Sequence, residues 1–99
     1  AAIAILAAAS LVMAGKPPAA VYGFEPPRVS PGIGVRSALS KVPVHLYKNG
    51  LDIVPDLPPN WQHAATLIHI GTPQLPFPNT LDHQIERVIL ALSAQSPPA

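Results

Sequence analysis

Proline spacing constrains the fold of this 99-residue chain more than any other sequence feature, because 14 prolines divide it into short segments. Proline lacks a backbone N–H and fixes φ, so it interrupts helices and central strands. Pro17-Pro18 and Pro26-Pro27 therefore mark breaks, and three prolines within residues 72–79 make that segment a loop. Only short helices and short strands fit between these breaks.

The segments between the prolines have clear preferences. Residues 1–14 predict a helix, because Ala, Leu and Met favour helices, and its apolar character on every face is typical of a helix buried on all sides. Apolar runs predict short strands at residues 20–24, 42–47 and 66–70. A short helix is expected near residues 35–39.

The last predicted element is an amphipathic helix, whose apolar face recurs at i, i+3, i+4 and i+7 through Ile85, Val88, Ile89 and Leu92. Asn79 or Thr80 would cap it, with Asp82 in its first turn and a frayed tail from Ser96 onward. Alternating helices and strands predict an α/β fold with both faces of the sheet covered. Three strands cannot bury an all-apolar helix, so we expect that N-terminal strands of the sheet are missing from this chain.

Composition excludes several classes of partner. Charged residues make up 11% of the chain, well below the usual quarter, which favours a portion of a larger domain. A net charge of +1 with scattered Lys and Arg argues against nucleic acid as a partner. No cysteine is present for a disulfide or a thiolate zinc site. The apolar residues 1–14 are too short for a transmembrane segment, and no basic region precedes them as in a signal peptide.

Asp52 is the first candidate for chemistry. It follows a predicted strand, on a loop stiffened by Pro55, Pro58 and Pro59. Ligands bind at that edge of α/β sheets, where a carboxylate can orient an imidazole for acyl transfer. The alternative is a turn-stabilising Asp beside Asn49-Gly50.

His83 is the second candidate. It is expected in the first turn of the last helix, about 200° around the wheel from Ile85, and so directed away from the core. The alternative is an ordinary exposed histidine. An acid followed by a histidine is the order of the α/β-hydrolase triad, whose nucleophile stands in a G-x-S-x-G turn. None of the serines here has those flanking glycines: Ser10, Ser30, Ser37, Ser40, Ser93 and Ser96.

Four segments resemble the class 3 lipase family, and together they span essentially the whole chain. VYGFEPPRV at residues 21–29 is similar to T-F-G-x-P-R-V, and NGLDIVPDLPP at 49–59 to N-x-x-D-x-V-P-x-L-P-P. DHQIERV at 82–88 resembles D-H-x-I-x-x-Y, and AAIAIL at 1–6 resembles the helix after G-H-S-L-G. Two features depart from the family, Glu25-Pro26-Pro27 before the arginine and Val88 in place of tyrosine.

The resemblance implies a serine ester hydrolase acting on acylglycerols or similar lipid esters. Asp52 would be the triad acid and His83 the base, while the serine and half of the oxyanion hole would precede Ala1. It implies no cofactor and no metal, and transient contact with a lipid interface. The fold implied is the C-terminal part of an α/β-hydrolase sheet with flanking helices, over residues 1–99.

Other polar residues are weaker candidates. Asp56 is expected to be a solvated loop residue, and His45 to be packed or surface-facing. His63 and His69 could form a metal pair, but no third ligand is evident. Trp61 would line an acyl pocket or, as we favour, anchor its loop. Two other functions stay open, a truncated, inactive lipase-like domain or non-catalytic binding module, and a small proline-rich secreted protein.

Overall fold

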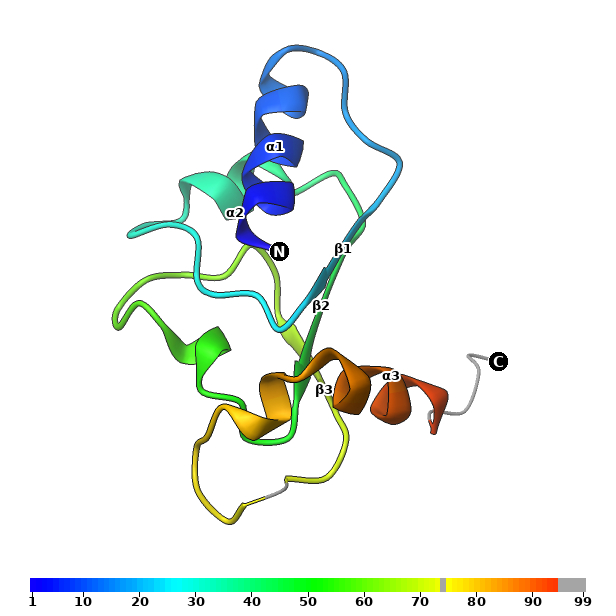
Figure 1. The fold of residues 1–99 in the computed structure, drawn as a ribbon. Helices are drawn as coiled ribbons and strands as arrows, with labels where there is room; N and C mark the ends of the chain where they lie inside the picture. Colours follow the sequence, from blue (N-terminus) through cyan, green and yellow to red (C-terminus); the bar gives the residue numbers. More distant parts are fainter. Residues whose placement is uncertain (74, 95–99) are drawn as a thin grey trace.

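The computed structural model describes residues 1–73 and 75–94 (Figure 1). Its elements follow the chain as α1 (Ala2–Met13), β1 (Val21–Phe24), α2 (Gly34–Ala38), β2 (Val44–Asn49), the 3-10 turn η1 (Val54–Asp56), β3 (Leu67–Ile70), the 3-10 turn η2 (Leu81–His83) and α3 (Ile85–Ser93).

The three strands form one parallel sheet in the order β1-β2-β3. Val21 pairs with Val44, and Leu46 pairs with Leu67. Because the strands are parallel, their carboxyl ends lie along one edge, and the segments that carry the candidate residues leave the sheet there. The predicted α/β class is confirmed as a three-stranded parallel sheet flanked by helices.

The core lies between α1, α2 and one face of the sheet. Ile5 from α1 and Leu46 from β2 are completely buried within it. On the other face of the sheet, Tyr22 stacks on His45 at 4.9 Å and Phe24 on Tyr47 at 5.4 Å between ring centroids. The stacked pairs follow the parallel register of β1 and β2, and Tyr22 and Phe24 stay exposed.

The prediction that the first helix is buried on all sides is wrong for the described chain. Only Ile5, Ala8 and Ala9 of α1 are buried, whereas Ile3 is 84% and Met13 is 83% exposed. The reason is that the described elements cover one side of α1 and leave its other sides open (Figure 1).

Strand β2 differs at its start from the predicted strand over residues 42–47. It begins at Val44, after Pro43, and continues to Asn49. Proline has no N–H to donate to the ladder, so pairing starts at Val44, directly after Pro43. The irregular loop expected at residues 52–59 contains the short turn η1.

The last helix also begins later than expected. Gln84 is its N-cap residue, and no side chain caps it, so the prediction of Asn79 or Thr80 as the cap is wrong. Of its four predicted core positions only Val88 is buried, at 1% exposed, while Ile85 is 57% exposed. Helix α3 packs against β2 and β3. The expected frayed tail lies outside the described residues.

Among the helices in the described ranges, none is both long enough and apolar enough to span a bilayer.

Candidate functional site

The loop after β2 and the segment before η2 are joined by backbone hydrogen bonds, and this brings Asp52 close to His83. The Ile53 N–H donates to the Asn79 carbonyl at 2.9 Å, and the Asn79 N–H donates to the Leu51 carbonyl at 2.9 Å. These bonds form a short parallel bridge between Asp52 and Asn79. His83 follows at the end of η2, so its imidazole lies over the carboxylate.

Asp52 and His83 are in direct contact. The distance from His83 Nδ1 to Asp52 Oδ2 is 2.6 Å, and Asp52 Oδ1 accepts the Val54 N–H at 2.9 Å. Asp52 is 0% exposed, whereas the His83 side chain is 44% exposed. When Nδ1 donates its proton to the carboxylate, Nε2 is the acceptor nitrogen of the neutral ring. The pair is therefore arranged to take a proton from a group outside it.

Asp82 stabilises this geometry through hydrogen bonds to neighbouring segments, a role not predicted from the sequence. We expected it to lie in a helix first turn, but it is fully buried in η2. Its Oδ2 accepts the Leu51 N–H at 2.9 Å and the Asn79 side-chain amide at 3.3 Å. Its backbone carbonyl accepts the Asn49 side-chain amide at 3.0 Å. These bonds fix η2 against the end of β2.

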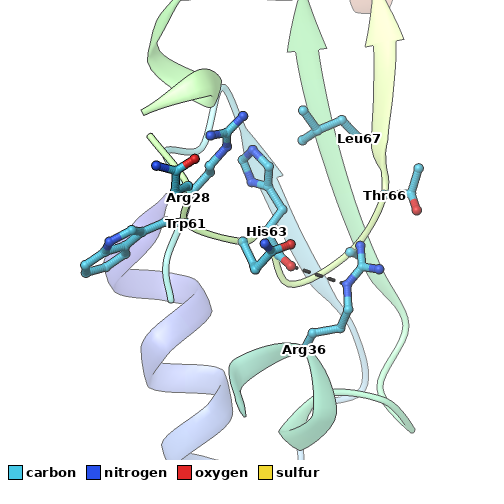
Figure 2. Close-up of a pocket in the computed structure, with 9 residues that line it drawn as sticks. Arg28, Arg36, Trp61, His63, Thr66 and Leu67 are labelled. Atoms are coloured by element: carbon cyan, nitrogen blue, oxygen red, sulfur yellow. Dashed lines mark hydrogen bonds between the residues drawn. The ribbon is translucent and has the colours of Figure 1, made fainter. Parts of the chain in front are cut away.

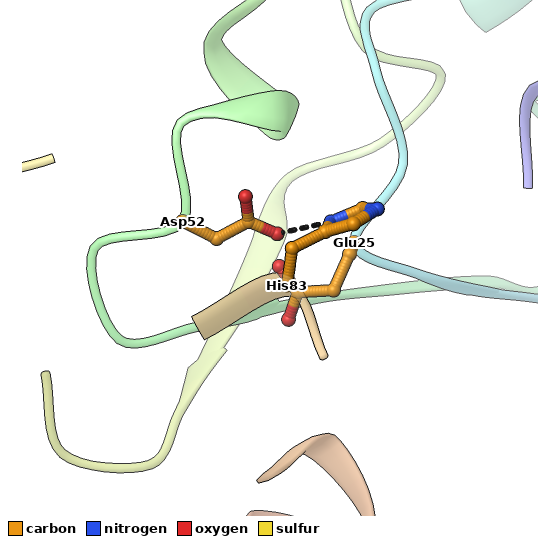
Figure 3. Close-up of side chains that lie close together, drawn as sticks. All are labelled: Glu25, Asp52 and His83. Atoms are coloured by element: carbon orange, nitrogen blue, oxygen red, sulfur yellow. Dashed lines mark hydrogen bonds and ion pairs between the residues drawn. The ribbon is translucent and has the colours of Figure 1, made fainter. Parts of the chain in front are cut away.

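Glu25 is the third member of the cluster. It directly follows β1, with a backbone φ of 55°, and is 4% exposed. Its Oε1 accepts the Asn49 N–H at 2.5 Å. Ligand atoms of Glu25, Asp52 and His83 all lie within 4.8 Å of one another (Figure 3). Burial raises the pKa of Glu25 to about 9, and the hydrogen bond to Asp52 and the charge of Asp52 add to this effect.

The same three side chains have the donor set of a metal site. Two carboxylates and an imidazole suit a divalent cation, and this is the group of three found among the described residues. In this structure, however, His83 Nδ1 is engaged with Asp52, so a cation would have to replace the proton between them. The expected absence of a metal stays a prediction.

The other candidate residues lie outside this cluster. Asp56 pairs with Lys48 at 3.3 Å. His63 Nε2 lies 2.6 Å from the Pro55 carbonyl, and burial lowers the pKa of its ring. His69 is exposed on β3, and neither it nor His63 belongs to the group above. His45 packs on Tyr22, as the sequence suggested.

A separate hollow of about 440 Å³ lies near the start of β3 (Figure 2). Its walls are mostly polar, from Arg28, Arg36, Asn60, Trp61, Gln62, His63 and Thr66. Arg28 and Arg36 each donate one hydrogen bond to a backbone carbonyl, of Pro58 and His63, at 3.3 Å. Acyl chains need apolar walls, so this hollow gives no support to Trp61 as the lining of an acyl pocket.

Comparison of this chain with family models, with curated proteins and with solved structures gives no match. The resemblance to class 3 lipases therefore rests on the motifs alone, and function has to be argued from the geometry of the site.

Proposed function

We propose that this chain carries the acid and the base of a serine ester hydrolase, within the C-terminal part of an α/β-hydrolase domain of the class 3 lipase type. The observation that carries the proposal is the 2.6 Å contact between His83 Nδ1 and Asp52 Oδ2. Asp52 is buried and held by the Val54 N–H, while the imidazole keeps access to solvent. A buried carboxylate behind a half-exposed imidazole is the arrangement that acyl transfer requires.

In the proposed reaction, a serine hydroxyl attacks the ester carbonyl and its proton passes to Nε2 of His83. Asp52 stabilises the imidazolium and fixes the ring. His83 then returns the proton to the leaving alcohol, and water releases the acid by the same steps. The serine would come from a segment outside this sequence, because no serine here stands in a G-x-S-x-G turn.

Two features of the fold support the placement in a larger sheet. In the described sheet, β1 is an edge strand, so its outer side is free to pair with another strand. The exposed apolar side chains of α1, such as Ile3 and Met13, need a partner layer. Further strands beside β1 would cover both, and α1 would then be the helix that follows the nucleophile.

Apolar side chains near the acid–base pair support a lipid ester as the substrate. Four large ones are exposed on the two loops that carry the pair: Ile53, Leu57, Phe77 and Leu81. Exposed apolar side chains on the segments that carry the pair favour acyl chains or a lipid interface over polar substrates.

A second candidate is a lipase-like binding module without catalysis. It is favoured by the lack of an elbow serine in residues 1–99. The coding sequence upstream of Ala1 separates the two functions. An upstream strand followed by G-x-S-x-G would support the ester hydrolase. An upstream sequence with no serine between glycines would leave the binding module as the remaining candidate.

The direct test is substitution in the natural polypeptide that carries this sequence, with kcat/KM measured on one soluble ester. His83→Ala should cost on the order of 10⁶ in kcat, and Asp52→Asn about 10⁴. Asp56→Asn and His69→Gln are matched controls that should stay within about threefold of wild type, because neither residue contacts the pair. Circular dichroism confirms that each variant folds. A crippled Asp56→Asn beside an active Asp52→Asn would contradict the proposal.

A further inference from the structure

We infer that Glu25 is a neutral carboxylic acid that donates a hydrogen bond to Asp52 and so acts as a positioning residue for the Asp52–His83 pair. The positioning role rests on the proposed function, whereas the protonation of Glu25 does not. The site would then be a chain of three groups, from Glu25 through Asp52 to His83; Figure 3 draws the three side chains together and marks the Asp52–His83 bond.

The first observation is an unpartnered atom. Glu25 Oε2 is buried and accepts no hydrogen bond from any residue that the structure describes. An ionised oxygen buried without a donor is costly, whereas a protonated oxygen needs only an acceptor. Asp52 supplies one, because its carboxylate lies next to Glu25 and a side-chain hydrogen bond between the two is among the causes of the raised Glu25 pKa.

The hydrogen bonds decide which carboxyl group keeps the proton, because two neighbouring buried carboxylates cannot both be ionised. Asp52 receives the Val54 N–H on one oxygen and His83 Nδ1 on the other. Among the described residues, Glu25 receives only the Asn49 N–H, on Oε1. Donors favour the ionised form, so Asp52 carries the negative charge and Glu25 Oε2 carries the proton.

The carboxylates that face Glu25 act in the same direction. Asp52 and Asp82 both raise the pKa of Glu25, after the larger effect of burial, whereas a protonated His83 would oppose them. The backbone conformation of Glu25 is a separate observation in support of its role. Glu25 has a φ of 55°, in the left-handed region that is unfavourable for a residue other than glycine. Such strain persists where the surrounding contacts hold the residue in place.

A third hydrogen bond to Asp52 has a chemical consequence. It limits rotation of the carboxylate, so that Oδ2 stays directed at His83 Nδ1. The bond comes from a neutral donor, so it adds no second negative charge beside the imidazole. Glutamine can replace a neutral glutamic acid in this role, because its amide also donates, whereas alanine cannot.

The first experiment follows the Glu25 carboxyl group by ¹³C NMR in the natural polypeptide labelled at its glutamate side chains. Glu25→Gln identifies the resonance by deleting it, and Glu86→Gln, on the exposed surface of α3, identifies an ordinary glutamate. The inference expects Glu25 to change its shift with a midpoint near pH 9. A midpoint below pH 6 would overturn it. This measurement needs no catalysis, so it stands even if the protein hydrolyses no ester.

The second experiment tests the rival occupant of the cluster. Protein freed of metal with EDTA is titrated with Zn²⁺ while the low-field Nδ1 proton of His83 is observed by NMR. The inference expects this proton to persist at one equivalent of zinc. Stoichiometric binding of Zn²⁺ with loss of the proton would show that the three side chains form a metal site, and would overturn the proton-sharing assignment.

The third experiment measures esterase activity in variants that fold by circular dichroism. Glu25→Gln should stay within about threefold of wild type at pH 7, and Glu25→Ala should lose about tenfold or more in kcat with KM unchanged. The wild type should lose activity as pH rises through about 9, where Glu25 ionises, and Glu25→Gln should lack this decline. An equal loss in both variants would overturn the inference.

Discussion

Asp82 offers the sharpest test of how the site is held together, because its carboxylate is buried and accepts hydrogen bonds from two segments of the chain. In Asp82→Ala, the Leu51 N–H loses its acceptor at 2.9 Å, and the Asn79 amide loses one at 3.3 Å. The Asn79 amide keeps a second acceptor, the Phe77 carbonyl at 2.9 Å. The substitution therefore leaves one buried donor without its partner and weakens another.

The expected cost follows from these contacts. An unsatisfied buried donor costs about 1–3 kcal/mol, and a weakened bond to a charged acceptor adds about 1 kcal/mol. The net loss in the free energy of unfolding should be about 2–4 kcal/mol. Asp82→Asn keeps an oxygen for the Leu51 N–H and should lose about 1 kcal/mol.

The assay is urea unfolding of the natural polypeptide, followed by circular dichroism. The midpoint should fall in the order wild type, Asp82→Asn, Asp82→Ala, with an unchanged m value. Glu86→Ala is the matched control, an exposed acid on α3, and should cost less than about 1 kcal/mol. If Asp82→Ala were no less stable than Glu86→Ala, the reasoning on the buried carboxylate would be refuted.

Three further predictions concern stability and solubility. The pKa of Glu25 rises from 4.5 to about 9 on folding, so the folded state keeps a proton that the unfolded chain releases. Its contribution to stability is full below pH 4.5 and is lost as pH rises through about 9, at up to about 1.4 kcal/mol per pH unit. Urea unfolding from pH 7 to 9 should show this slope, and Glu25→Gln should flatten it. Gly71→Ala should lower the melting temperature by several degrees, because φ is +70° and the new Cβ would clash with the Asn49 side chain. Gly32→Ala is the control: its Cβ would meet open space, so the melting temperature should not change. Residues 1–99 expressed alone should bind a hydrophobic dye and aggregate through the exposed side of α1, and a soluble, cooperatively unfolding monomer would refute this.

Local sequence features were sufficient to predict the strands and the first helix. Proline pairs bound the run that forms Val21–Phe24, and the third strand lies within the segment predicted for it. The burial of the final helix was predicted less well. Its apolar period indicates a face that should be buried, but the described elements do not cover that face. Only Val88 of that face is buried. Periodicity reports which face is apolar, but neighbouring elements decide whether it is covered.

The chain order of Asp52 and His83, with their motifs, was enough to single them out as a pair. Their 2.6 Å contact depends on the bridge between Asp52 and Asn79, which no local pattern indicates. Glu25 was noticed only as a departure from a motif. Its place in the cluster depends on the parallel pairing of β1 and β2, which carries Glu25 beside the end of β2, and on a positive φ that its residue type does not suggest.

The hydrogen bonds that assemble the cluster join residues far apart in the chain. The bond between Asn49 and Glu25 spans 24 positions, and that between His83 and Asp52 spans 31. Each closes a long loop, and the entropy of closure opposes it until the strands between have paired. Local helix formation can occur much earlier. A chain that has formed its helices but not its parallel sheet therefore has no aligned imidazole, so the contact between Asp52 and His83 forms late in folding and is absent from a partly folded chain.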